Sequence, residues 1–163
     1  MIKITFPDGS VKEFSSGISS IEIARQLSPG LAREVYAATV NGSVVDLTRP
    51  VTSDATLILH KWDDEPARHA FWHSSAHLMA GALESLYPGI KFGIGPAIEN
   101  GFYYDFDLEH KISDEDFPRI EEEMARIIKE AEPFERFTLD RDRAIALCAD
   151  LKQQLKVDHL QSG

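Results

Sequence analysis

The chain opens with an alternation of apolar and polar residues. Residues 2–6 follow the two-residue period of a half-buried β-strand, and residues 11–14 repeat it more weakly. Between them lies a Pro-Asp-Gly turn signal at residues 7–9. The pattern therefore predicts an antiparallel hairpin at the N-terminus.

A short helix is expected next, with Ser19 or Ser20 as its cap and Ile21, Ala24 and Leu27 on one face. The Ser-Pro-Gly of residues 28–30 should end this helix, because proline and glycine interrupt helical structure.

Residues 37–40 and 44–45 then flank Asn41-Gly42, a strong hairpin signal, and residues 56–60 form a last strand. The order of two strands, a helix and three strands predicts a β-grasp, in which a helix crosses a mixed sheet.

The acidic segment at residues 62–66 marks a domain boundary, so the expected domains are residues 1–62 and 63–163. A helix is predicted over residues 67–86, ended by Tyr-Pro-Gly at 87–89. An extended segment follows at residues 92–96.

Asn100-Gly101 predicts a hairpin between Ile98 and residues 102–106. Ser113, with Asp116 three residues later, opens a long acidic helix that ends before Pro133. Its expected buried stripe consists of Phe117, Ile120, Met124, Ile127 and Ala131.

A strand is predicted at residues 134–139. Asp140 should then cap a single last helix that carries Ala144, Leu147, Leu151 and Leu155. The mixture of strands and helices places the whole chain in the α+β class.

The net charge of −10 is uneven: residues 1–62 carry six basic and six acidic residues, and residues 63–163 carry 11 and 21. An acidic segment repels a phosphate backbone, which argues against a stand-alone nucleic-acid binder. Cys148 is the only cysteine, so no internal disulfide is possible and a cytosolic location is expected. No stretch approaches the ~18 to 20 apolar residues of a membrane helix.

His69, His73 and His77 are spaced four residues apart, so they share one helix stripe. Two imidazoles one turn apart can hold a metal, but a structural zinc site needs about two more ligands. The zincin protease pattern fails because no glutamate follows the first histidine. These observations leave two interpretations equally open: a functional histidine pair, or histidines with an ordinary role on the surface or in the core.

Three further features favour structure over chemistry. The Gly-Ile-Gly-Pro at residues 93–96 lacks a third glycine, so a tight turn is favoured over a phosphate loop. Tyr103 and Tyr104 point to opposite faces of a strand, so one packs in the core and the other can present its hydroxyl to a pocket. Cys148 is expected to be a small core filler.

Particular segments resemble a known family. Residues 4–10 and 40–42 look like the TGS domain, a β-grasp module that stringent-response synthetases and some GTPases also carry. Residues 73–79 are similar to the first histidine motif of the threonyl- and alanyl-tRNA synthetase editing domain. Residues 93–96 and 99–105 resemble the threonyl enzymes in particular. The chain thus resembles the N-terminal part of the bacterial-type threonyl-tRNA synthetase family.

That resemblance implies hydrolysis of serine wrongly attached to tRNA(Thr). It implies that His73 and His77 position water or the adenosine end, that Lys156 is the catalytic-site lysine, and that Tyr104 lines the substrate pocket. No metal is implied at this site in the bacterial threonyl enzymes. In the alanyl relatives, the equivalent histidines join a zinc site.

The family completes its editing pocket with a Cys-x-x-x-His motif, which this sequence lacks. We therefore expect a truncated editing domain that neither charges tRNA nor edits efficiently alone. ATP, Mg and Zn are expected only for the absent catalytic domain. The parent enzyme would dimerise through that domain, and tRNA(Thr) is the expected partner of the parent enzyme. Two alternatives stay open: a non-catalytic RNA- or ribosome-interaction module, and a zinc-dependent alanyl-type trans-editing hydrolase.

Overall fold

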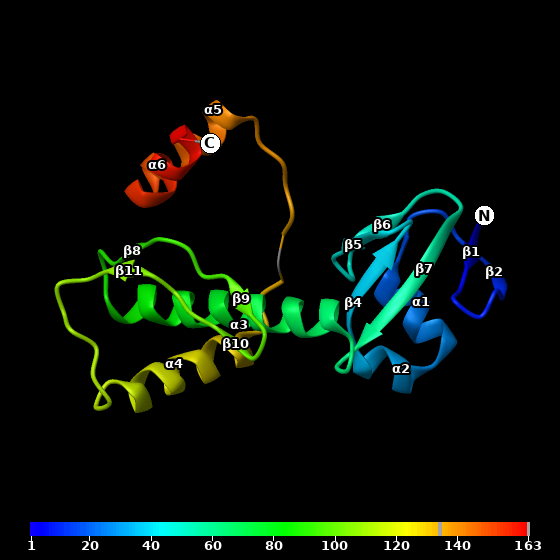
Figure 1. The fold of residues 1–163 in the computed structure, drawn as a ribbon, viewed down its shortest axis with the longest axis horizontal. Helices are drawn as coiled ribbons and strands as arrows, with labels where there is room; N and C mark the ends of the chain where they lie inside the picture. Colours follow the sequence, from blue (N-terminus) through cyan, green and yellow to red (C-terminus); the bar gives the residue numbers. More distant parts are fainter. Residues whose placement is uncertain (134, 163) are drawn as a thin grey trace. The chain divides into compact units, whose positions relative to one another are not determined.

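The computed structural model describes residues 1–133 and 135–162. It forms two compact units, residues 1–72 and 73–163 (Figure 1). The division between the units falls inside a long helix, later in the chain than the 62/63 boundary that the sequence suggests. None of the helices in the described residues has the length and apolar character needed to cross a bilayer.

The first unit contains a five-stranded mixed sheet in the order β2-β1-β7-β4-β5. Its strands are β1 (Ile2–Thr5), β2 (Val11–Phe14), β4 (Val35–Val40), β5 (Ser43–Val45) and β7 (Ala55–Lys61). β1 runs parallel to β7 and antiparallel to β2, which confirms the predicted mixed sheet. A separate short pair joins β3 (Ile18–Ser19) to β6 (Pro50–Val51).

Both predicted hairpin turns are present in this sheet. Gly9 ends the first turn with a φ of 79°, and Asn41 and Gly42 form the second with φ values of 50° and 80°. Such positive values are what Asn-Gly turns provide between twisted strands. The turns therefore set the register that pairs Val40 with Ser43.

Helix α1 (Ser20–Leu27) begins at a capping box, in which the Ser19 side chain accepts from the Glu22 backbone and the Glu22 side chain accepts from Ser19. This arrangement satisfies two donors that a helix start leaves open. The predicted helix is confirmed, although Ile23 rather than Ile21 is fully buried. A second helix, α2 (Pro29–Glu34), follows directly because Ser28 caps it and proline fits its first turn.

The core of the first unit lies between α1 and the sheet. Side chains from one face of β1 and β7 meet the apolar face of α1, as strand alternation requires. Nine buried residues form this cluster: Ile2, Ile4, Phe14, Ile18, Ile23, Ala38, Val51, Ala55 and Leu57.

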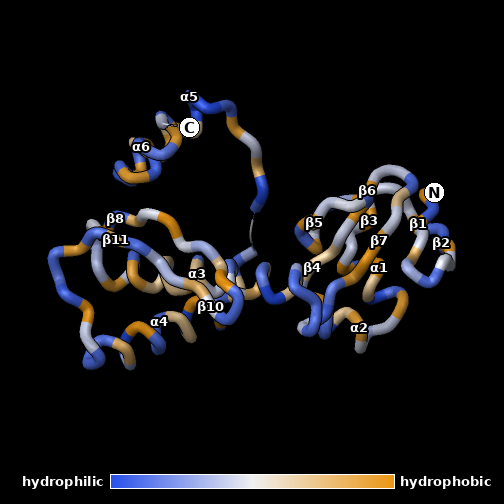
Figure 2. Tube along the Cα trace, viewed as in Figure 1, coloured by the Kyte–Doolittle hydropathy of each residue, from blue (hydrophilic) through white to orange (hydrophobic). Residues whose placement is uncertain are grey.

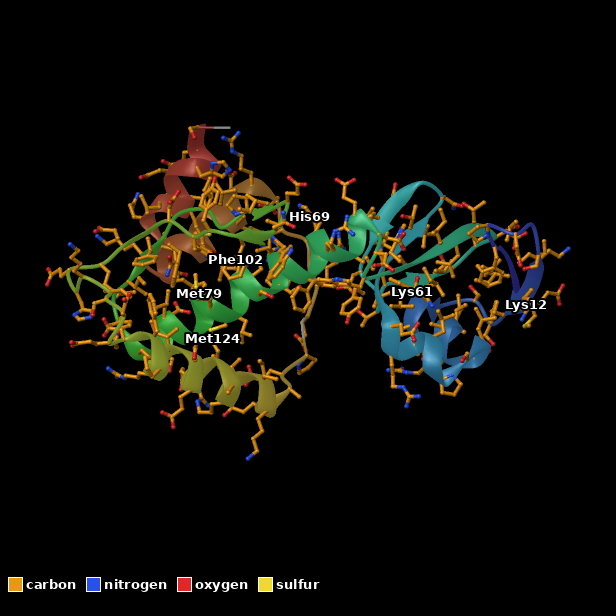
Figure 3. All side chains as sticks on the ribbon, turned by 60° about the horizontal axis from the view of Figure 1, so that its bottom comes forward. Lys12, Lys61, His69, Met79, Phe102 and Met124 are labelled. Atoms are coloured by element: carbon orange, nitrogen blue, oxygen red, sulfur yellow. The ribbon has the colours of Figure 1, made fainter. Side chains whose placement is uncertain are left out.

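The second unit is built around α3 (Glu65–Leu86), which continues into it from the first, and α4 (Phe117–Glu130). Figures 1 and 3 both show α4 running along α3. Gly81 of α3 lies close to Ile127 of α4, where an added Cβ would stand 3.8 Å from the isoleucine Cδ1. The two helices therefore pack closely at this point, with room for an ordinary contact at Gly81.

Short strand pairs complete the second unit. β8 (Lys91–Phe92) pairs with β11 (Phe106–Asp107), and β9 (Ala97–Ile98) pairs with β10 (Gly101–Phe102). The second pair is the expected hairpin. Its turn consists of Glu99 and Asn100, one residue earlier than the predicted Asn100-Gly101 turn. Gly101 already lies in the strand, opposite Ile98.

The core of the second unit is smaller. It consists of Ala80, Leu83, Ile90, Phe92 and Ile120. Met79 and Met124 pack against it from the two helices (Figure 3). Figure 2 shows apolar and polar residues alternating along α4. The predicted stripe is wrong at both ends. Phe117, the first residue of α4, is 51% exposed, and Ala131 is exposed because it follows the last residue of α4 in a left-handed conformation.

The C-terminal part differs most from expectation. Residues 135–139 form no strand, while Phe134 lies outside the described residues. Asp140 caps a helix as predicted, but one helix becomes two, α5 (Arg141–Asp150) and α6 (Gln154–Ser162). The break coincides with Lys152, which has a φ of 56°. A left-handed residue ends the helical hydrogen-bond pattern, so α6 takes a new direction.

Candidate functional site

His73 and His77 lie on α3 with their Nε2 atoms 3.0 Å apart, and their ring planes are nearly perpendicular. One nitrogen must carry the proton in this hydrogen bond while the other accepts it. At least one of the two imidazoles is therefore neutral. The helix places them one turn apart on one stripe, which is why the four-residue spacing brings the rings together.

The pKa of His77 is held below its usual value of 6.5. Partial burial is the largest cause, followed by the charges of His73 and Lys156. Burial and nearby positive charge both disfavour the imidazolium form. His77 is therefore neutral at pH 7 and able to accept a proton.

Lys156 belongs to α6, whose first turn is anchored by Gln153. The Gln153 carbonyl accepts the Lys156 amide at 3.0 Å, and its buried side chain accepts the Phe92 amide at 3.2 Å. Val157, only 5% exposed, packs next to it. These contacts attach α6 to β8, so that the Lys156 charge acts on His77. Sequence reasoning missed Gln153, because one glutamine just before a polar helix gives no periodic signal.

Tyr104 is held by packing. Its ring meets Phe92 edge to face, with ring centroids 5.3 Å apart. It also covers Gly95, where an added Cβ would stand only 2.3 Å from the tyrosine ring. Burial raises the pKa of the Tyr104 hydroxyl, which therefore stays protonated and can donate a hydrogen bond. The structure thus joins His73 to His77, brings the Lys156 charge to bear on His77, and places Tyr104 against the second-unit core.

The Gly-Ile-Gly-Pro segment at residues 93–96 has a structural role, which is to hold the chain that carries Tyr104. The Gly93 amide donates to the Asp105 carbonyl at 2.8 Å, and the Asp105 amide donates to the Ile94 carbonyl at 3.0 Å. These bonds align the segment with the chain that carries Tyr104. Gly95 is needed because the tyrosine ring occupies the space of its side chain.

Metal ligands are few around the histidine pair. Across residues 1–133 and 135–162, no group of three His, Cys, Asp or Glu side chains is arranged to hold a metal ion. Cys148 lies half-buried in α5. The donor set that the described residues offer is thus two imidazoles, already hydrogen-bonded to each other.

A second polar cluster was not anticipated from the sequence. Asp116 accepts from the Tyr87 hydroxyl at 3.0 Å and lies 3.1 Å from His110, whose ring stacks on Tyr87. The backbone amide of Ser113, followed by His110, lowers the pKa of Asp116 to about 2. These bonds tie the loop before α4 to the end of α3, so we assign them a structural role.

Comparison with known proteins defines the class of the first unit. Residues 2–61 match the TGS domain family. This agrees with the mixed sheet crossed by α1, and it confirms the fold predicted for the N-terminal part of the chain.

Relatives over nearly the full chain are threonine–tRNA ligases. The ligase of Parabacteroides distasonis is 53% identical over 159 residues, and that of Porphyromonas gingivalis is 54% identical over 160; each match covers 97% of this chain and 24% of the relative. The ligase of Acetivibrio thermocellus is 51% identical over 97% of this chain. The chain spans about a quarter of the length of these relatives.

These matches, together with the TGS domain, place the chain with the N-terminal regions of bacterial threonyl-tRNA synthetases. The family resemblance suggested by the sequence motifs is thereby confirmed. The roles of individual site residues stay predictions.

Proposed function

We propose that this chain acts as the N-terminal region of a threonine–tRNA ligase and contributes to removing serine from mischarged Ser-tRNA(Thr). The observation that carries this proposal is the His73–His77 hydrogen bond at 3.0 Å, with the Lys156 charge acting on His77. The neutral imidazole of His77 beside a cation provides a proton acceptor and a stabiliser of negative charge. Both accelerate the hydrolysis of an ester.

In the proposed reaction, a water oxygen attacks the carbonyl carbon of the seryl ester. His77, neutral because its pKa is lowered, accepts the water proton directly or through His73. Lys156 would stabilise the negative charge that develops on the carbonyl oxygen. The bond to the ribose oxygen then breaks, the proton passes to that oxygen, and serine and uncharged tRNA are released.

Selection of serine over threonine would depend on the size of the editing pocket. A synthetic site can distinguish threonine from serine by only about 1 to 3 kcal/mol, because they differ by one methyl group. A second pocket that excludes this methyl increases the discrimination. We assign Tyr104 to this pocket, since its packing on Gly95 and Phe92 fixes where its hydroxyl can lie.

The complete enzyme would charge tRNA(Thr) with threonine using ATP. We propose that ATP, Mg²⁺ and Zn²⁺ are bound outside these 163 residues, and that the enzyme is a cytoplasmic homodimer through its catalytic domain. The acidic second unit fits this division, because most of the affinity for tRNA phosphates would have to come from elsewhere in the enzyme.

The test is the substitution His73→Ala in the complete ligase, with Ser-tRNA(Thr) deacylation as the readout. We expect a loss of about 10²- to 10⁴-fold, the range for general acid–base groups. Threonylation should not change. His69→Ala, on the same helix stripe, is the matched control and should retain deacylation.

Two results would replace this proposal. Unchanged deacylation in His73→Ala would favour the interaction-module alternative. One tightly bound zinc per chain, lost in His77→Ala, would favour the zinc-dependent alanyl-type chemistry. Efficient deacylation by the 163-residue chain alone would contradict the view that further pocket residues are required.

A further inference from the structure

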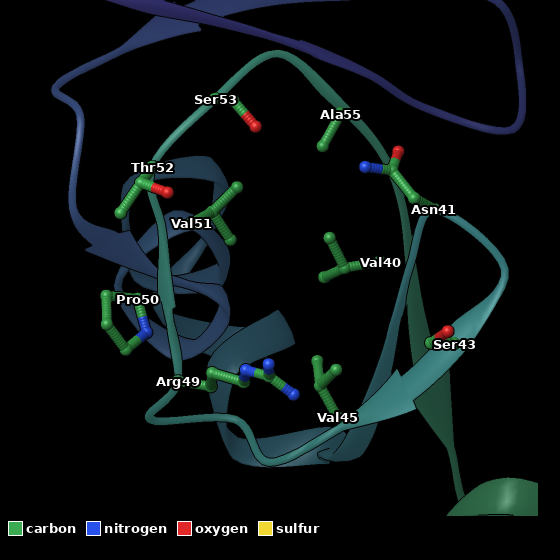
Figure 4. Close-up of a pocket in the computed structure, with 10 residues that line it drawn as sticks. All are labelled: Val40, Asn41, Ser43, Val45, Arg49, Pro50, Val51, Thr52, Ser53 and Ala55. Atoms are coloured by element: carbon green, nitrogen blue, oxygen red, sulfur yellow. The ribbon is translucent and has the colours of Figure 1, made fainter.

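A pocket of about 300 Å³ lies in the first unit, between the β4–β5 hairpin and the segment that leads through β6 into β7 (Figure 4). It is separate from the histidine pair, which belongs to the second unit. Its volume is at the lower end of the ~300 to 1,000 Å³ range of ligand pockets, so any ligand must be small.

The floor of this pocket is apolar. Val51 and Ala55 are buried members of the first-unit core, and Val40 and Val45 pack against that core. Figure 4 shows the Val40, Val45 and Val51 side chains directed toward the middle of the pocket. Because the floor is the outer layer of a packed core, its shape is preformed.

The rim supplies hydrogen-bond donors. The Asn41 side-chain oxygen accepts the Thr56 amide at 2.9 Å, which leaves its NH₂ group directed into the pocket (Figure 4). The Ser53 hydroxyl also points inward. The positive φ of Asn41 and its bond to β7 hold the amide in place.

Arg49 provides the only charge on the pocket lining. Its guanidinium points towards Val45 along one edge of the pocket, opposite Asn41 and Ser53 (Figure 4). Within residues 1–133 and 135–162, no carboxylate forms an ion pair with Arg49. The nearby acids have other partners: Asp46 accepts from Thr48, and Asp54 accepts from the Lys3 amide.

From this arrangement we propose that the pocket binds a small aliphatic carboxylate. The Arg49 guanidinium pairs with the carboxylate, and the valine floor receives the aliphatic body. The Asn41 amide and the Ser53 hydroxyl lie at the opposite edge of the pocket, away from the carboxylate (Figure 4). The lining contains no acidic residue, so it offers no partner for an ammonium group. A nucleotide is too large for this volume.

The experiment titrates the 163-residue chain with isobutyrate and follows backbone amide shifts by NMR. We expect saturable shifts at Val51 and Ala55, with a Kd on the order of 1 mM for so small a ligand. Isobutyramide, the uncharged isostere, should bind at least about tenfold more weakly, because a charged hydrogen bond is lost.

Arg49→Gln should weaken isobutyrate binding by about tenfold or more, whereas Ser53→Ala, at the opposite edge of the pocket, should change it little. Arg33→Gln, on α2 of the same unit, is the control and should bind normally. Arg49 is exposed, so its substitution should leave the fold intact, which the unchanged amide spectrum will show. No shift with isobutyrate, or equal binding of isobutyramide, would overturn the proposal. Equal binding of inorganic phosphate would overturn it too, by showing a general anion site.

Discussion

The two units of this chain differ in how their structure is held together. In the first, five hydrogen-bonded strands and nine buried core residues form one continuous system. In the second, two-residue strand pairs and a five-residue core surround α3 and α4. In a continuous sheet, neighbouring strands share and resist a local distortion, whereas an isolated strand pair has no such support. The proposed editing residues therefore lie in the unit whose geometry is more easily disturbed.

Within the second unit, the sparsest attachment is that of α5 and α6. No residue of α5 is buried, and Val157 is the only buried residue of α6. Lys156 stands on this weakly attached element. The histidine pair, by contrast, is fixed by a continuous helix. Lys156 should thus be lost from the site before His73 and His77 separate.

The largest expected difference between the units is in their response to core truncation. Leu57→Ala removes a side chain that is 1% exposed in the middle of β7. It should lower the free energy of unfolding of the first unit by ~2 to 5 kcal/mol. Val157→Ala should cost about 1.5 kcal/mol and act only on α6. Amide hydrogen exchange, read element by element, measures both effects.

The comparison would fail if Val157→Ala lowered the protection of α3 and α4 amides as much as that of α6. The second unit would then unfold as one cooperative body. Leu155→Ala, at an exposed position of the same helix, is the control and should change little.

Gly95→Ala tests the close packing of the second unit. The new Cβ would stand 2.3 Å from the Tyr104 ring, so the ring must move. We expect a loss of about 1 to 3 kcal/mol in stability, as for other overpacked sites. In the complete ligase, Ser-tRNA(Thr) deacylation should fall while threonylation is retained.

Gly81→Ala is the matched control for this change. Its Cβ would meet Ile127 at an ordinary 3.8 Å, and alanine favours a helix by up to ~1 kcal/mol over glycine. Stabilisation by Gly81→Ala together with destabilisation by Gly95→Ala would support the steric account. Equal stability of the Gly95→Ala variant would show that Tyr104 has room to move.

The first unit was predictable because its signals are local. Strand alternation at residues 2–6, the turn at Asn41-Gly42 and the cap at Ser19 each specify structure within a few residues. Even there, α2 was missed, because Ser28-Pro29 reads equally well as a helix end and as a helix start.

The second unit was harder to predict because its determinants are tertiary. The left-handed Lys152 that separates α5 from α6 has no sequence signal. Neither has the bond from Phe92 to Gln153, which joins residues far apart in the chain. The spacing of His73 and His77 predicted their proximity, but nothing short of the fold couples Lys156 to them.

Gln153→Ala measures the attachment that this bond provides. Its loss leaves the buried Phe92 amide without an acceptor, at a cost of about 1 to 3 kcal/mol. Hydrogen exchange at Phe92 should accelerate, and the α6 amides should lose protection. Gln154→Ala is the neighbouring control, because the Gln154 side chain bonds Asp158 on the helix surface. Equal effects of the two substitutions would contradict the anchoring role of Gln153.

The smallest expected effect is on the pKa of His77, and it tests the placement of Lys156. Because the folded pKa lies below the unfolded value near 6.5, the unfolded chain binds more protons as pH falls through that value. The contribution of His77 to the free energy of unfolding is therefore fully present above pH 6.5 and declines as the pH falls below that value. Lys156→Met should raise the pKa only part of the way to its ordinary value, since burial remains the larger cause.

NMR titration of the histidine ring signals measures this shift, with Lys129→Met on α4 as the control that should leave His77 unchanged. The lysine acts on His77 only while α6 stays docked on β8. Gln153→Ala should therefore raise the His77 pKa in the same direction as Lys156→Met, and adding it to Lys156→Met should raise it little further. An unchanged pKa in Lys156→Met would remove the lysine from the site and leave the two histidines to act without it.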